Sequence, residues 1–227
     1  MRNPHHRLVS ALLVPCKHLS RFVAYAMLVA VAGVVSTSDT RSALAAAAGT
    51  PQALVTTVAN QAINTMRQSA SASEREARFT TLLKDDFDVP RIARFVLGKY
   101  WASASEPERK EFGTVFESYL ARAYSNRFGE YEGETVSVTG LRSEGNDATI
   151  VSSEIIHQQG RPPVKLEWRI YKTGDDYRIL DVSVAGISMV LTHKQEFASI
   201  MEHDGGGVAG LIRTVQMKLR DGSSAQR

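Results

Sequence analysis

The spacing of apolar residues changes at about residue 134, and this change constrains the fold more than any other feature of the chain. Before it, apolar residues recur at helical intervals; after it, they alternate with polar residues. In the segment VKLEWRIYK, which begins at Val164, every second side chain is apolar. Strict alternation is typical of a strand with one buried face and one wet face. The chain therefore predicts helices first and a half-buried sheet afterwards.

Four strand-like segments are separated by turn signals over residues of about 134–185. The segments are ETVSVTGL, ATIVSSEIIH, VKLEWRIYK and YRILDVSVAG, and the intervening turns are EGND, QQGRPP and TGDD. Short polar connections of this kind join antiparallel neighbours. We expect a four-stranded antiparallel meander. The second strand is the least regular, because Ser152 and Glu154 interrupt one face and Ser153 and His157 the other.

Four helices are predicted before the sheet, within residues of about 50–130. Their starts carry residues that cap helix N-termini: Thr50, Ser73, Asp88 and Ser105. The second start has Glu76 three residues later, as in a capping box. Gly98 is placed to end the third helix, and the fourth extends toward Phe128.

Two further helical patterns, within residues of about 187–220, close the chain. Helices segregated from a single antiparallel sheet indicate the α+β class. Residues 46–220 are expected to form a single domain, and the polar tail at 221–227 is expected to be disordered.

Residues 1–45 have the pattern of a signal peptide. Basic residues precede the apolar run FVAYAMLVAVAGVV at 22–35, and small residues that suit signal peptidase follow it. The run is shorter than the roughly 20 residues that a membrane-spanning helix needs. We expect cleavage between Ala45 and Ala48 and export from the cytoplasm; an uncleaved amino-terminal anchor is the alternative.

Removing this segment changes the charge of the chain. Residues 1–45 hold five of the 27 Lys and Arg but one of the 24 Asp and Glu, so the remainder carries 22 basic and 23 acidic side chains. The basic pI therefore gives no reason to expect a nucleic-acid partner. The single cysteine, Cys16, lies in the same segment. The mature chain would have neither disulfides nor a thiol nucleophile, which suits an oxidising compartment.

A search for catalytic or metal-binding patterns gives little. The HExxH and GxSxG motifs and a phosphate-binding loop are missing from the sequence. His193 and Glu196 lie one helical turn apart, but a catalytic zinc needs a third ligand, so a solvated helix face is favoured. Asp181 interrupts the apolar pattern of the last strand, where a cross-strand ion pair with Lys165 or Arg169 is expected. No metal or cofactor is predicted.

Large apolar side chains are spread over segments that must converge. They are Phe95, Tyr100, Trp101, Phe112, Phe116, Tyr119, Trp168, Phe197 and Met201. A filled core is the ordinary explanation for such stripes. The walls of an internal cavity would show the same periodicity, so the pattern leaves both open.

Two long segments bear a resemblance to a known family. The run FDVPRIARFVLGKYWASASEPERKEFGTVFESYLARAY resembles the toluene-tolerance, or MlaC, family of periplasmic lipid-binding proteins. The segment DVSVAGISMVLTHKQEFASIMEHDGGGVAGLIRTVQMK is similar to the closing part of that family. RFVLGKYW and SNRFGEYEGE look closer to its hopanoid-associated branch. The likeness covers residues of about 50–220.

This resemblance implies a soluble lipid carrier without enzymatic activity. The implied ligand is a phospholipid or a hopanoid. The implied partners are an inner-membrane ABC transporter with an MCE-domain subunit and a lipoprotein in an outer-membrane porin complex. The implied fold is a curved antiparallel sheet resembling nuclear transport factor 2, with helices on its concave side and acyl chains between them.

The predicted lipid site combines the resemblance with strand parity and helical phase. From the sheet it takes Val136, Val138, Leu166, Trp168, Ile170, Leu180 and Val182, and from facing segments Phe95, Trp101, Phe116, Tyr119, Ile187 and Met189. Two acyl chains suggest a pocket near or above about 1,000 Å³. The alternatives are a small-molecule enzyme using Glu154 or His157, and an adaptor protein whose interior is filled.

Overall fold

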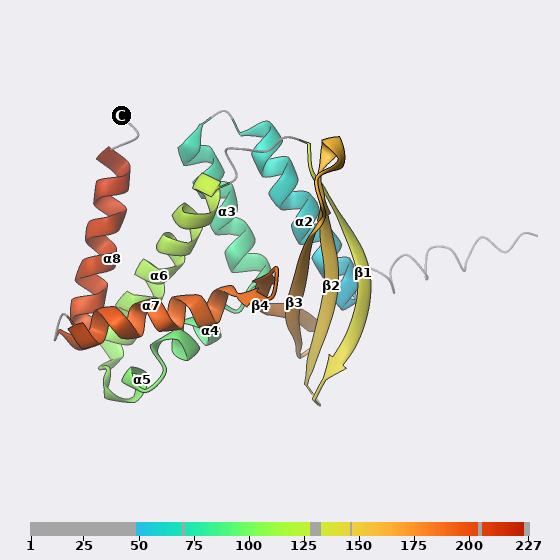
Figure 1. The fold of residues 1–227 in the computed structure, drawn as a ribbon. Coiled ribbons are helices and arrows are strands. Elements are labelled where there is room, and N and C mark those ends of the chain that lie inside the picture. The colour runs from blue at the N-terminus through green and yellow to red at the C-terminus, as the bar shows by residue number, and fades with distance from the viewer. Residues whose placement is uncertain (1–48, 70, 128–132, 146, 204–205, 225–227) are drawn as a thin grey trace, which may run out of the picture. The chain divides into compact units, whose positions relative to one another are not determined.

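The computed structural model describes residues 49–69, 71–127, 133–145, 147–203 and 206–224. The predicted signal peptide and its cleavage site lie outside these residues. Within them, helices come first, an antiparallel sheet follows, and two helices close the chain (Figure 1). The predicted α+β class is confirmed.

The elements, in chain order, are α2 (Pro51–Gln68), α3 (Ala72–Asp86), α4 (Val89–Leu97), α5 (Tyr100–Ser103), α6 (Glu106–Arg127), β1 (Thr135–Glu144), β2 (Ala148–Ile156), the 3₁₀ turn η2 (Gln158–Gly160), β3 (Val164–Thr173), β4 (Asp176–Val184), β5 (Ile187–Ser188), α7 (Met189–His203) and α8 (Gly207–Ser224). The short helix α5 has no counterpart in the prediction. Helix α8 includes residues 221–224, which the sequence assigns to a disordered tail. No helix among the described residues combines the length and apolarity needed to cross a membrane.

Most predicted helix starts are correct, and one is wrong. Thr50 caps α2 by accepting a hydrogen bond from the Ala53 N–H at 3.2 Å. Asp88 caps α4, which ends at Gly98 with φ +53°. The second helix begins two residues earlier than predicted, because the hydroxyl that accepts a hydrogen bond, from the Glu74 N–H at 3.1 Å, belongs to Ser71. Glu76, the predicted partner of Ser73, instead forms an ion pair with Arg122 of α6 at 3.0 Å.

The sheet has the order β1-β2-β3-β4-β5 with antiparallel pairs throughout. It is the predicted meander with one two-residue strand added at its edge. The register shifts in β4, where Arg169 pairs with Asp181 but the next residue, Ile170, pairs with Ile179. Leu180 is therefore the extra residue of a bulge, and the face of Trp168 and Val182 continues through Ile179.

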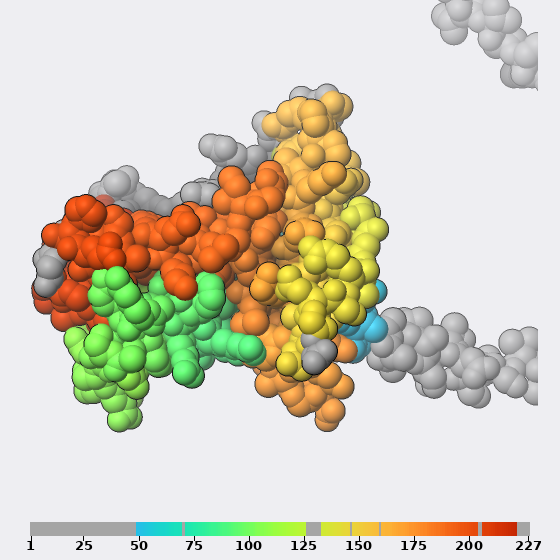
Figure 2. Space-filling view, turned by 60° about the horizontal axis from the view of Figure 1, so that its bottom comes forward, coloured from blue at the N-terminus to red at the C-terminus, as the bar shows by residue number. Residues whose placement is uncertain are grey.

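The buried apolar residues form two clusters. One lies among the helices and includes Phe112, Phe116, Phe197 and Leu211. The other lies between α2 and the sheet and includes Val55, Val151, Ile170 and Ile179. Helix α2 contacts β1 and β2, whereas α4 and α7 contact each other and β4. Figure 1 shows α2 and α3 on one face of the sheet, and Figure 2 shows α7 (orange) beside α4 (green).

Candidate functional site

A cavity of about 560 Å³ is lined by members of both apolar clusters. The lining residues are Val58, Ala59, Ala62, Ile63 and Met66 of α2; Phe79, Leu82 and Leu83 of α3; Phe87; Ile92; Phe116, Leu120 and Tyr124 of α6; Glu134; Val136; Ile155; His157; Arg161; Leu166 and Trp168; Leu180, Asp181, Val182 and Val184; and Met189, Val190 and His193 of α7. The volume lies within the usual range of about 300–1,000 Å³ for ligand sites. It is smaller than the sequence-based expectation.

Seven of the thirteen predicted site residues line this cavity: Phe116, Val136, Leu166, Trp168, Leu180, Val182 and Met189. Strand parity explains this placement, because Leu166, Trp168 and Val182 lie on the sheet face that α2 covers. The predicted set omitted α2 and α3, although their stripes were visible in the sequence. The small side chains Ala59 and Ala62 lie on the stripe of α2 and leave space beside the sheet.

Six predicted residues lie elsewhere: Phe95, Trp101, Tyr119, Val138, Ile170 and Ile187. Ile170 and Val138 belong to the cluster between α2 and the sheet. Ile187 is 61% exposed in β5. Tyr119 packs against Phe197 and donates its hydroxyl to Glu196 at 3.3 Å.

Phe95 and Trp101 do not line this cavity: Phe95 lies on the outer side of α4, and Trp101 is half-buried against the cluster among the helices. The buried residues of α4 include Val89, Ile92 and Val96, and Phe95 lies roughly 130° around the helix from their centre. It is 46% exposed, with the Lys194 Nζ 4.3 Å from its ring centroid. Trp101 lies in α5 beneath the Arg109 guanidinium, 5.2 Å from the ring centroid.

The indole of Trp168 is held within the sheet. Its Nε1–H donates to the hydroxyl of Ser153 at 2.9 Å, and this hydroxyl comes from the neighbouring strand. Ser153 is 1% exposed. An indole N–H without a partner would be costly next to apolar surface. Because Ser153 accepts this proton, Trp168 can present its ring to the cavity without an unsatisfied donor.

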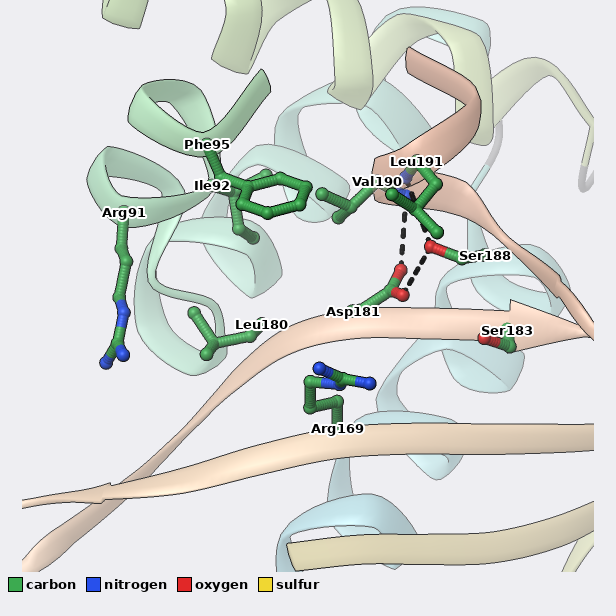
Figure 3. A pocket seen from close by; sticks show the side chains of 10 residues that line it. All are labelled: Arg91, Ile92, Phe95, Arg169, Leu180, Asp181, Ser183, Ser188, Val190 and Leu191. Atoms are coloured by element: carbon green, nitrogen blue, oxygen red, sulfur yellow. Dashed lines mark hydrogen bonds between the residues drawn. The ribbon is translucent and has the colours of Figure 1, made fainter. Parts of the chain in front are cut away.

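Asp181 caps α7 and does not form the predicted ion pair. Its Oδ1 accepts from the Val190 N–H at 3.1 Å, and its Oδ2 accepts from the Ser188 hydroxyl at 2.5 Å. The same hydroxyl accepts from the Leu191 N–H at 3.1 Å. Arg169, one of the two expected partners, pairs with Glu144 at 3.1 Å. The carboxylate thus ties the first turn of α7 to β4 (Figure 3).

His193 is also placed differently from the prediction. The sequence predicts a solvated helix face here, but the His193 side chain is only 12% exposed, whereas that of Glu196 is 35% exposed. Its Nε2 lies 3.0 Å from the Tyr124 hydroxyl, and its ring makes edge contacts with Phe116 and Tyr119. Within the described residues, no three His, Cys, Asp or Glu side chains gather in a way that would hold a metal ion.

A second hollow of about 430 Å³ lies on the outer side of the wall between α4, β4 and α7 (Figure 3). It shares Ile92, Leu180, Asp181 and Val190 with the larger cavity. Phe95 lines only this outer hollow, where its ring points toward Val190. A single layer of side chains therefore separates the two hollows.

Glu154 and His157, the two residues named for the enzymatic alternative, do not both face the cavity. His157 follows β2 and lines the cavity. Glu154 is next to the inward-facing Ser153 and so points to the opposite face. The structure does not bring the two together at the cavity.

Two comparisons place the chain among known proteins. The model of the family described as MlaC protein matches residues 56–217, which include both walls of the cavity. A solved structure of a phospholipid-binding protein from Ralstonia solanacearum, in complex with a phospholipid, is similar with a TM-score of 0.64 and 21% sequence identity. The match covers 75% of this chain and 97% of that one. At this identity the likeness shows a shared fold.

Proposed function

The chain belongs to the MlaC family, and from this premise we propose that it is a periplasmic lipid carrier. It binds the acyl or other apolar part of a phospholipid or a hopanoid and shuttles the lipid between membranes. Residues 1–45 serve as its export signal. Its partners are an inner-membrane ABC transporter with an MCE-domain subunit and an outer-membrane lipoprotein-porin complex, and it performs no chemistry on the lipid.

The apolar lining of the cavity is the observation that carries this proposal. Only five of its 27 lining residues have acidic, basic or imidazole side chains, namely Glu134, His157, Arg161, Asp181 and His193. The rest are aliphatic or aromatic, with the hydroxyl of Tyr124 bonded to His193. A lining of this kind suits a flexible hydrocarbon chain, which has no polar groups to pair.

The energy of exposing a lipid explains why a carrier is needed. Two acyl chains have about thirty methylenes, and at about 0.8 kcal/mol per methylene their full exposure to water would cost on the order of 20 kcal/mol. Binding that relies on contact with aliphatic and aromatic side chains is tolerant of chain shape and allows release. The Ralstonia solanacearum protein, which shares the fold, was solved in complex with a phospholipid, and this supports a phospholipid as the ligand of this chain.

The proposal is tested by identifying what the protein carries. The exported form is purified without detergent, extracted with organic solvent, and the extract is quantified by mass spectrometry. About one lipid per protein is expected, together with transfer of labelled lipid from donor to acceptor vesicles. Recovery of no lipid and no transfer would contradict the proposal.

An enzyme remains a second candidate because His157 lies at the cavity, with its Nδ1 3.4 Å from the Glu134 carboxylate. A carboxylate and an imidazole at this distance are a common acid-base pair. The transfer experiment separates the two functions. A carrier delivers the donor lipid to the acceptor vesicles with its mass unchanged. An enzyme instead produces a lipid of a different mass, and the amount of this product increases with time.

A further inference from the structure

Three ionisable side chains of the cavity lining lie close together, in a cluster we call the polar rim: Glu134, His157 and Arg161. Glu134 precedes β1, His157 follows β2, and Arg161 precedes β3. The Glu134 Oε1 lies 3.4 Å from the His157 Nδ1 and 3.6 Å from an Nη of Arg161. The side chains of Glu134 and His157 are each 17% exposed, while that of Arg161 is 51% exposed. The rim thus faces both the cavity and the solvent.

The backbone around the rim is held in a specific conformation. Gly133 has φ +97°, and its carbonyl accepts from the Gln158 amide at 3.1 Å. A Cβ at this position would lie 2.7 Å from the Gln158 Nε2, so a side chain would disturb the contact. This bond joins the start of β1 to η2 and holds Glu134 and His157 next to each other.

The other two ionisable residues of the lining have structural partners. Asp181 accepts hydrogen bonds from the first turn of α7. His193 is bonded to Tyr124 and packed among aromatic rings. The polar rim holds the remaining ionisable side chains of the lining: one carboxylate, one imidazole and one guanidinium.

The rim combines opposite charges. Glu134 contributes one negative charge and Arg161 one positive charge. A guanidinium has five N–H donors and suits a phosphate. A carboxylate suits an ammonium group and repels a headgroup that is only anionic. A headgroup with a phosphate and an amine would complement both charges, whereas a neutral lipid would complement neither.

We propose that the polar rim binds the headgroup of a zwitterionic, amine-bearing phospholipid, with the phosphate at Arg161 and His157 and the ammonium at Glu134. This assignment rests on the proposed lipid carrier function and specifies its ligand class. It favours a phospholipid over a hopanoid without phosphate. The acyl chains enter the cavity beside Trp168, and the headgroup stays at the rim.

A series of lipids with identical acyl chains tests the assignment. The exported protein is incubated with vesicles that contain equal amounts of diacylglycerol, phosphatidic acid and phosphatidylethanolamine, and the bound lipids are quantified by mass spectrometry. Wild type is expected to prefer phosphatidylethanolamine. Arg161→Gln should lower the bound amounts of phosphatidic acid and phosphatidylethanolamine about tenfold relative to diacylglycerol, since a charge-assisted hydrogen bond is lost. Glu134→Gln should lose the preference for phosphatidylethanolamine over phosphatidic acid.

A matched control and a competitor complete the experiment. Arg142→Gln removes an arginine of similar exposure that pairs with Glu167 and is not part of the cavity lining, so the lipid ratios should stay unchanged. Inorganic phosphate at constant ionic strength should not displace the lipid; displacement would mean that the rim is a site for free phosphate. Arg161→Lys keeps the charge and should retain part of the preference, and thermal unfolding of each variant reports whether it is folded.

The outcomes distinguish this assignment from the proposed function. Unchanged lipid ratios in Arg161→Gln, or an equal loss of all three lipids, would overturn the headgroup assignment while lipid binding by wild type stands. A wild-type protein that takes up none of the three lipids, and arrives with none, would overturn both.

Discussion

At the scale of single residues, Ser153 shows how a polar side chain in a strand can serve an apolar cavity. In the sequence it weakens the pattern of the second strand. In the structure it is buried and accepts the indole N–H of Trp168. A single sequence does not reveal such a pair, because the two residues lie on different strands and their opposition depends on the register.

Removing the Ser153 hydroxyl should destabilise the protein only while the indole is present. Ser153→Ala leaves a buried N–H without its acceptor, at a cost of about 1–3 kcal/mol in the free energy of unfolding. The same change in a Trp168→Phe background should cost much less. Urea unfolding of the four proteins in this cycle measures the coupling, and equal costs in both backgrounds would show that the hydrogen bond is energetically unimportant.

Asp86 provides a residue-scale prediction about pH. Burial raises the pKa of its carboxyl above 3.8, the Asp85 charge adds to the shift, and Arg178 opposes it. The Oδ2 atom is buried without a hydrogen-bond partner among the described residues. The folded state therefore binds this proton more tightly than the unfolded state, so stability falls as pH rises from about 3.8 through the raised pKa.

Asp86→Asn should accordingly unfold at a higher temperature than wild type at pH 7. The gain should disappear below about pH 3.8, where the carboxyl is protonated in both states. Asp176→Asn, at an exposed aspartate, serves as the control and should change little at either pH. A lower unfolding temperature of Asp86→Asn at pH 7 would mean that the attraction of Arg178 outweighs the burial.

At the scale of elements, the two overlapping Ser-x-x-Glu patterns at the start of α3 compete for one cap. Ser71 with Glu74 and Ser73 with Glu76 both fit the capping box. The first one is used, and Glu76 pairs with Arg122 of α6 instead. The choice depends on a contact between helices that are distant in sequence, so local propensity could not decide it.

Substitution of the two serines tests this interpretation directly. Ser71→Ala should lower the free energy of unfolding by about 1 kcal/mol, as for other lost N-caps. Ser73→Ala is the matched control and should cost a few tenths of a kcal/mol, because within the described part of the chain its hydroxyl contacts only that of Ser71. Denaturant unfolding measures both. A larger loss for Ser73→Ala would support the start that the sequence predicts.

Other elements show how far periodicity reaches. The four long strands follow from alternation, yet the bulge at Leu180 and the cap of α7 by Asp181 do not. Both depend on where β4 lies relative to its neighbours. Helical phase likewise put Phe95 in the predicted lipid site, whereas its side chain lines the outer hollow. Periodicity gives the buried face of each element and leaves open what that face contacts.

At the scale of the whole molecule, the cavity results from the separation of the two apolar clusters. Each cluster is packed, and the space between them is bordered by the apolar faces of α2, α3 and the sheet. Filled cores and cavity walls have the same sequence pattern, so the sequence alone could not separate them. The resemblance to a lipid-binding family, and not periodicity, favoured the cavity.

Filling the cavity should block lipid binding without unfolding the protein. Ala62→Trp places a large side chain on the cavity-facing side of α2, where it takes the space that an acyl chain would use. Lipid recovered after purification should fall to a small fraction of the wild-type amount. Ala77→Trp, on the exposed side of α3, is the control and should keep its lipid. Full loading of a folded Ala62→Trp protein would place the lipid elsewhere.

The bond between Trp168 and Ser153 has an optical consequence. The chain has two tryptophans, and Trp101 of α5 does not line the cavity, so Trp101→Phe leaves one indole, in the cavity wall. Because its N–H is fixed within the sheet, the fluorescence of that indole reports mainly on what touches its ring. Hydrocarbon and water differ in polarity, so its emission wavelength follows occupancy. The fluorescence of the Trp101→Phe variant should therefore report whether the cavity is occupied, without an attached dye.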